Sequence, residues 1–213
     1  SPDPAMLLHT IYLVAICAEA ISGALMGIRK DMDIFGICLI GTVAALGGGT
    51  VRDLLIGHYP LGWVAHPEYL AFTICAAIVA AVAARALHHF KSAFLVVDAL
   101  GLVAFTIIGC DIARSFDNFH PAIVVMLGMV TGVFGGLLRD VLCNEIPLVL
   151  RREIYASVSL LTGTMYVLIL HWQIDGRIAT LASLLLGFAV RLLAIRFHWE
   201  LPRMDKERVR GFD

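Results

Sequence analysis

The 213-residue chain has little charge of either sign. Charged residues make up 15% of it and hydrophobic residues 60%, and the mean hydropathy is +0.87. Soluble domains usually carry about 25% charged residues and clearly fewer apolar ones. The composition therefore excludes an ordinary water-soluble domain and indicates a membrane protein. A formal net charge of −1 also gives no reason to expect a nucleic-acid partner.

Enzyme signatures are missing as well. The chain has no HExxH, no Gly-x-Ser-x-Gly and no P-loop, so we expect neither an enzyme nor an ATP-driven pump, and no cofactor or resident metal. An intramembrane hydrolase is the remaining enzymatic alternative. There is no CxxC pair, and the five cysteines lie singly in apolar segments, where they are expected as small buried hydrophobes. They are Cys17, Cys38, Cys75, Cys110 and Cys143.

Long apolar runs are abundant. A transmembrane helix needs about 20 mostly apolar residues, and seven windows qualify, which predicts an all-α integral membrane protein with seven transmembrane helices. The windows are 6–28, 34–57, 69–88, 93–115, 121–143, 153–171 and 177–198. Residues 1–5 precede a methionine and are expected to be a cloning remnant, and residues 199–213 are expected to form a basic tail.

The basic residues predict the orientation in the membrane. With seven helices the two termini lie on opposite sides, and Lys and Arg concentrate in cytoplasmic loops. One side would receive eleven basic residues, including Arg29, Lys30 and Arg151, and the other only Arg114 and Arg177. We therefore expect an external N-terminus and a cytoplasmic C-terminus.

The chain also repeats itself. Residues 41–61 align with residues 128–148 at a shift of 87, and the identical positions include two glycines, an Arg-Asp pair and a proline. The match predicts that 6–90 and 91–172 are copies of one three-helix unit, followed by a seventh helix at 177–198. Because three is odd, the second copy enters the membrane from the opposite face, as in the inverted repeats of transporters and some channels.

The repeated element contains costly glycines in the middle of helices. Each one costs roughly 1 kcal/mol relative to alanine, and glycine runs permit a kink or an unwound turn whose carbonyls must face protein or water. We expect a conduction path here, with a hydroxyl from Thr50 and another from Ser22; the alternative is close helix packing. The glycines concerned are Gly47, Gly48, Gly49, Gly135 and Gly136.

Each glycine pair is followed by an arginine, Arg52 or Arg139. A mid-membrane arginine costs about 2.5–3.5 kcal/mol or more, so both should face the protein interior. Their sequence neighbours, Asp53 and Asp140, point about 100° away around the helix, so we look for partners elsewhere. The candidates are Glu19, Asp98 and Asp111. The arginines either lock the fold through such pairs or set the field and gate of a pore.

The doubled Gly-Gly-x-x-Arg-Asp, with Pro60 or Pro147 eight residues after each arginine, resembles the prokaryotic TRIC family of trimeric intracellular cation channels. The resemblance covers roughly residues 6–198. It implies seven helices in two inverted triplets plus one, and a homotrimer in the bacterial or archaeal cell membrane. It further implies a K⁺- and Na⁺-permeable pore in each protomer, lined by the kinked second and fifth helices.

The two copies differ at one motif position, and a rival hypothesis about the function stays open. The second copy has Phe134 where the first has Gly47, so the two half-pores should be unequal. Some bacterial relatives are described as transporters of glycine, and inverted repeats serve carriers as well as channels. Our first hypothesis is a monovalent cation channel; the second is a carrier for glycine or another small solute. A scaffold protein would not explain why a costly motif occurs twice.

Overall fold

The structure is a computed structural model that describes residues 3–151 and 154–202, and it is all-helical apart from turns and one isolated bridge residue. The helices are α1 (Pro4–Arg29), α2 (Ile34–Ile56), α3 (Gly62–Ala65), α4 (Glu68–Ala83), η1 (Ala84–Ala86), α5 (Phe90–Phe116), α6 (Pro121–Leu142), η2 (Leu148–Leu150), α7 (Ala156–His171) and α8 (Gly176–Phe197). Most of the expected basic tail, residues 203–213, lies outside the described residues.

Within the described ranges, six helices are long and apolar enough to cross a membrane. They are α1, α2, α4 with η1, α5, α6 and α8. The seventh expected span is shorter than predicted: α7 has 16 residues, which is about 24 Å at 1.5 Å per residue, against a hydrocarbon core of about 30 Å. The four-residue α3 was not expected from the sequence, because it falls in the turn-rich link between two apolar windows.

Capping residues set several helix starts. The carboxylate of Asp33 accepts from the backbone N–H of Gly36 at the start of α2, and Asp175 accepts from Arg177 at the start of α8. Asp3 does the same for α1, where Pro4 holds the first helical position. For that reason α1 begins at Pro4, and residues 4 and 5, which we expected to lie outside the fold, are helical.

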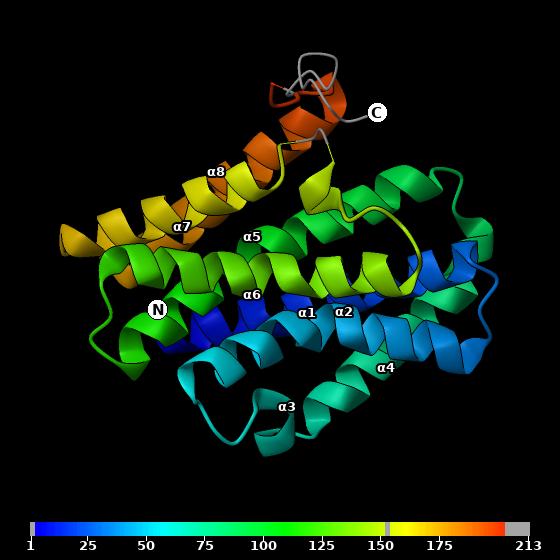
Figure 1. The fold of residues 1–213 in the computed structure, drawn as a ribbon, viewed down its shortest axis with the longest axis horizontal. Coiled ribbons are helices and arrows are strands. Elements are labelled where there is room, and N and C mark those ends of the chain that lie inside the picture. Colours follow the sequence, from blue (N-terminus) through cyan, green and yellow to red (C-terminus); the bar gives the residue numbers. More distant parts are fainter. Residues whose placement is uncertain (1–2, 152–153, 203–213) are drawn as a thin grey trace, which may run out of the picture.

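The contacts group the helices into two sets of three. Helices α1, α2 and α4 pack on one another, as do α5, α6 and α7, while α1 against α5 and α2 against α6 join the sets. Helix α8 packs on α7 and α5. Figure 1 shows α2 and α6 side by side in the middle, with the α7–α8 pair on one flank and α3 and α4 on the other. The inverted relation of the two sets stays a prediction.

Helix α5 is the most buried of the candidate spans. Leu102, Val103 and Ile107 on this helix are fully buried and belong to the largest apolar cluster. A helix that is apolar all round belongs in the core of the bundle, and α5 contacts α1, α6, α7 and α8. Asp98 and Thr106 in the buried part of α5 are fully enclosed and must find their partners inside the protein.

Candidate functional site

Glycines of the repeated motif bring α2 and α6 together. A Cβ atom on Gly48 would overlap the backbone carbonyl of Thr131, and one on Gly135 would overlap that of Ala44. Both helices are unbroken α-helix through these positions. The unwound turn expected at the glycines is therefore wrong for this conformation, because the glycines serve the close approach of two backbones.

The remaining motif positions face different surroundings. Gly49 lies beside the Arg52 guanidinium, where a Cβ would make an ordinary contact at 3.4 Å, and Gly136 lies beside that of Arg139, where a Cβ would be tight at 3.3 Å. Gly47 and Thr50 instead line an apolar groove of about 390 Å³ on the α2–α4–α6 surface. The Thr50 hydroxyl donates to the Leu46 carbonyl of its own helix at 2.7 Å. The structure thus places these two residues apart from both arginines.

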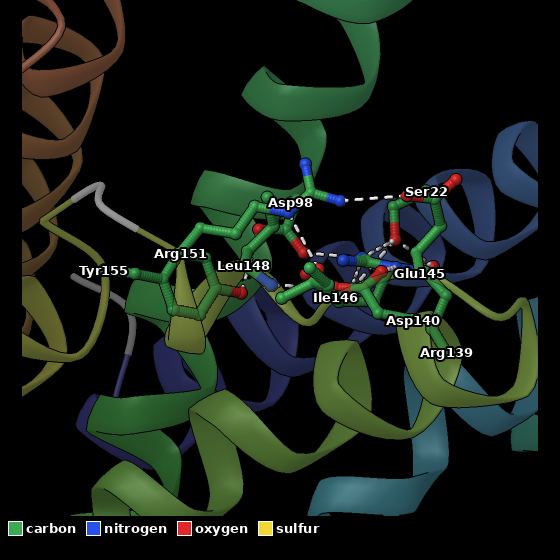
Figure 2. Close-up of polar contacts among 10 residues, drawn as sticks. Ser22, Asp98, Arg139, Asp140, Glu145, Ile146, Leu148, Arg151 and Tyr155 are labelled. Atoms are coloured by element: carbon green, nitrogen blue, oxygen red, sulfur yellow. Dashed lines mark hydrogen bonds and ion pairs between the residues drawn. The ribbon is translucent and has the colours of Figure 1, made fainter. Parts of the chain in front are cut away.

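Arg139 is fully buried and held by several partners, most of which Figure 2 shows around it. Its Nη1 donates to Asp98 Oδ1 at 2.6 Å and to Ser22 Oγ at 2.9 Å, and its Nε donates to Asp140 Oδ1 at 2.8 Å. Glu19 Oε2 lies 3.5 Å from Nη1. Of the expected partners, Asp98 and Glu19 are thus beside Arg139, together with its own neighbour Asp140.

Aromatic side chains complete this cluster, which we call the Arg139 cluster and define as Glu19, Ser22, Asp98, Arg139, Asp140 and Tyr155. The Tyr155 hydroxyl donates to Asp98 Oδ2 at 2.9 Å. The ring of Phe94 lies 4.6 Å from the guanidinium carbon of Arg139, a cation–π contact. All its members are less than 4% exposed, so the cluster is enclosed within the helix bundle.

Arg52 is held by fewer groups. Its Nε and Nη2 donate to Asp53 Oδ1 at 3.1 and 2.9 Å. The expectation that Arg52 pairs with Glu19, Asp98 or Asp111 is wrong, because its long side chain turns back onto the acid next to it. His58 Nδ1 also lies 3.3 Å from Asp53 Oδ1.

A cavity of about 260 Å³ opens beside Arg52. It is lined by Leu8, His9, Tyr12, Arg52, Asp53, His58, Gly62, His66, Tyr69, Ile108, Asp111 and Ile112. Asp111 accepts from the Tyr166 hydroxyl at 3.1 Å and lies 3.8 Å from Arg114. The two arginine sites therefore differ: Arg52 borders a cavity, whereas Arg139 is enclosed.

The two aspartates of the motif also hold the chain that follows. Asp53 Oδ2 accepts from the backbone N–H of Gly62 at 3.3 Å, and Asp140 Oδ2 accepts from that of Leu148 at 3.0 Å. Each carboxylate thus joins its arginine to the link after its helix. Motion of either arginine is coupled to the position of that link.

A second ionic group lies near the Arg139 cluster, on the loop between α6 and η2. Glu145 accepts from Lys30 at 2.8 Å and from Arg151 at 3.1 Å, with Arg29 at 3.8 Å. The hydrogen bond from Lys30, with the nearby positive charges, lowers the pKa of the Glu145 carboxyl below its ordinary value. These contacts tie the end of α1 to the loop that Asp140 also holds.

Three of these partners were missed by sequence reasoning. Tyr155 has no special spacing, and a histidine such as His58 in a turn has no predicted partner. The third is Arg191, which is fully buried, contacts the Tyr155 ring at 5.0 Å and donates to the Ile154 carbonyl at 3.3 Å. Its position in an apolar helix was the available signal.

Among residues 3–151 and 154–202, no His, Cys, Asp and Glu side chains group as metal ligands.

Comparisons with known proteins agree on the family. A family model described as glycine transporter matches twice, at residues 9–85 and 95–171. The trimeric intracellular cation channel orthologue from Rhodobacter sphaeroides superposes with a TM-score of 0.87 at 32% identity, covering 90% of this chain and 98% of that one. The chain belongs to the prokaryotic TRIC family.

Other members of the family agree over nearly the full length. The inner membrane protein YadS of Escherichia coli (strain K12) is 36% identical over 200 residues, covering 92% of this chain and 96% of its own length. A TRIC cation channel from a structural study of conductance has a TM-score of 0.83 at 34% identity, covering 92% and 97% of the two chains. The first of these relatives is described as an inner membrane protein and the second as a cation channel, and neither description indicates an enzyme family.

Proposed function

We propose that this TRIC-family protein is a monovalent cation channel, permeable to K⁺ and Na⁺, with a path inside each protomer of a homotrimer. The observation that carries the proposal is the pair of motif arginines on α2 and α6, one bordering a cavity and one enclosed with three acids. The similarity of the chain to a TRIC cation channel supports cations as the permeant ions.

The proposed path follows the contact between α2 and α6, from the cavity beside Arg52 to the Arg139 cluster. In this conformation the path is closed, because the facing backbone occupies the space beside Gly48 and Gly135. Arg139 and its ion-pair partners close the other end. Separation of the two helices would expose backbone and hydroxyl oxygens that replace part of the water shell of a cation. Arg139, Glu19 and Asp98 are the proposed gating charges at one end, and Arg52 and Asp111 at the other.

The proposed placement in the membrane follows from the basic residues. We place α7 as a seventh, short span, the Arg139 cluster towards the cytoplasm and the cavity beside Arg52 towards the outside of a bacterial or archaeal cell membrane. A short span is accommodated by local thinning of the bilayer or by assembly with other chains.

Planar bilayers test the channel directly. The full chain, reconstituted with potassium chloride on both sides, should give discrete current steps, and a salt gradient should give a reversal potential of the sign that cation selectivity requires. Bilayers treated with detergent from a mock purification are the control. A correctly assembled protein that gives no steps in many bilayers would contradict the proposal.

A glycine carrier is the second candidate. It is favoured by the matching family description and by the cavity that Arg52, Asp53 and Asp111 line, which holds a guanidinium and two carboxylates. Such a pair of charges suits the carboxylate and the ammonium group of a small amino acid. Uptake of labelled glycine into matched liposomes, saturable and lost in Arg52→Gln, would favour the carrier over the channel.

A further inference from the structure

The Arg139 cluster has more acid than one arginine can neutralise. Three carboxyl groups, those of Glu19, Asp98 and Asp140, share Arg139, and all four side chains are buried. If every acid were ionised, the cluster would carry two uncompensated negative charges inside an apolar bundle. Buried charges without partners are strongly destabilising, so at least one of these acids needs a further positive partner, which would reduce the excess from two charges to one.

The hydrogen bonds single out Glu19. The two hydrogens on Arg139 Nη1 are taken by Asp98 and Ser22, and the one on Nε is taken by Asp140. Arg139 Nη2 has no hydrogen-bond partner among the described side chains and backbone. Glu19, at 3.5 Å from Nη1, therefore lies near the guanidinium but receives no hydrogen from it.

Asp98 and Asp140 are each supplied from a second side. The Tyr155 hydroxyl donates to Asp98 at 2.9 Å, and the Leu148 backbone N–H donates to Asp140 at 3.0 Å. These two acids are therefore satisfied as carboxylates. Glu19 has no equivalent donor in the cluster other than a single serine hydroxyl.

That hydroxyl cannot satisfy an ionised Glu19. Ser22 Oγ lies 2.8 Å from the backbone carbonyl of Glu19 and 3.0 Å from its carboxyl Oε2. A serine has one hydrogen, so two acceptors compete for it. If Oε2 carries a proton, that proton points at Ser22 Oγ, the serine hydrogen goes to the carbonyl, and Arg139 donates to the remaining lone pair of the serine.

We propose that Glu19 is a proton-binding site, and that the proton held there lets three carboxyl groups share Arg139 in the shut conformation. Without the proton, the Glu19 carboxylate would repel Asp98 and Asp140 and compete with them for the same guanidinium. This would weaken the contacts of α1 with α5 and α6. The stability of the shut conformation would therefore depend on pH, whichever solute the path carries. The charged and titratable groups that face Glu19 across this site are Asp98 of α5, Arg139 and Asp140 of α6, and Tyr155 ahead of α7.

Infrared spectroscopy tests the proton directly. The full-length protein in lipid nanodiscs at neutral pH should show the carbonyl stretch of a protonated carboxylic acid, shifted by deuterium oxide and by isotope-labelled glutamate. Glu19→Gln should remove the band and Glu145→Gln should keep it. Absence of a glutamate-sensitive band over the whole accessible pH range would overturn the proposal.

A melting experiment adds a second readout. Glutamine copies the shape of a protonated glutamate, so Glu19→Gln should match the unchanged protein in melting temperature at mildly acidic pH and exceed it at alkaline pH. If Na⁺ or K⁺ raised the melting temperature of the unchanged protein and Glu19→Gln lost this effect, with no infrared band, a bound metal cation would be the partner and the proposal would be wrong.

Discussion

At the scale of single residues, the two motif arginines differ in how tightly they are held. Replacing Arg139 with glutamine leaves buried carboxylates without their cation, a loss of about 3–5 kcal/mol for a broken buried pair. We expect Arg139→Gln to lower the melting temperature sharply or to prevent assembly. Thermal melting in detergent checks this, with Arg196→Gln as the control, because Arg196 is exposed on α8.

Arg52 should behave differently, because it borders a cavity and pairs with one acid. Arg52→Gln removes a positive charge from a site with little water, where charges act over short, weakly screened distances. We expect the variant to assemble and to change the conductance or the open probability in bilayers. Equal loss of folding in the Arg52 and Arg139 variants, with surviving channels unchanged, would argue against a conduction role for Arg52.

At the scale of elements, the crossing of α2 and α6 depends on glycine. An alanine at position 48 or 135 would place Cβ against the backbone of the facing helix, which has little freedom to yield. Overpacking typically costs about 1–3 kcal/mol, so Gly48→Ala and Gly135→Ala should both destabilise the protein in denaturation experiments. Gly176→Ala is the control, since the nearest atom there is at an ordinary 3.7 Å; equal effects at all three positions would contradict the packing role.

The ion pairs of Glu145 should make the stability of the protein depend on pH. Its pKa is lowered in the folded protein, so its contribution to stability is present above its ordinary value of 4.5 and is lost as pH falls below it. Ion pairs at this exposure are worth about 0.2–1 kcal/mol. On acidification the melting temperature of the unchanged protein should fall more than that of Glu145→Gln; parallel curves would show that the pairs contribute nothing.

The elements were largely predictable, because long apolar runs identify spans before any contact is known. Helix α7 was predicted too long, since the sequence does not mark where the link after α6 ends. Two of the acids beside Arg139, Asp98 and Glu19, were among the predicted ones, because an acid buried in an apolar helix needs a cation; its neighbour Asp140 was not. The partner of Arg52 was not, because helical geometry alone turns Asp53 away, and only the flexible arginine side chain brings the two together. Tyr155 left no signal, because its role depends on a tertiary contact with α5.

At the scale of the whole molecule, the open prediction is which way the bundle faces. Three basic residues meet on Glu145: Arg29 at the end of α1, Lys30 in the link before α2 and Arg151 in the link after α6. Positive charge is retained in the cytoplasm during insertion, so this end and the C-terminus should be cytoplasmic. The cavity beside Arg52 would then open to the outside.

Reporter fusions decide the orientation. A fluorescent protein that folds only in the cytoplasm, fused after Asp213, should give signal, and an alkaline phosphatase active only outside should be silent at the same position. If α7 spans the membrane, the same reporters fused before α1 should give the reverse pattern, because an odd number of spans puts the termini on opposite sides. Cytoplasmic signal from both termini would mean an even number of spans, with the short α7 not crossing, and would contradict the proposed orientation.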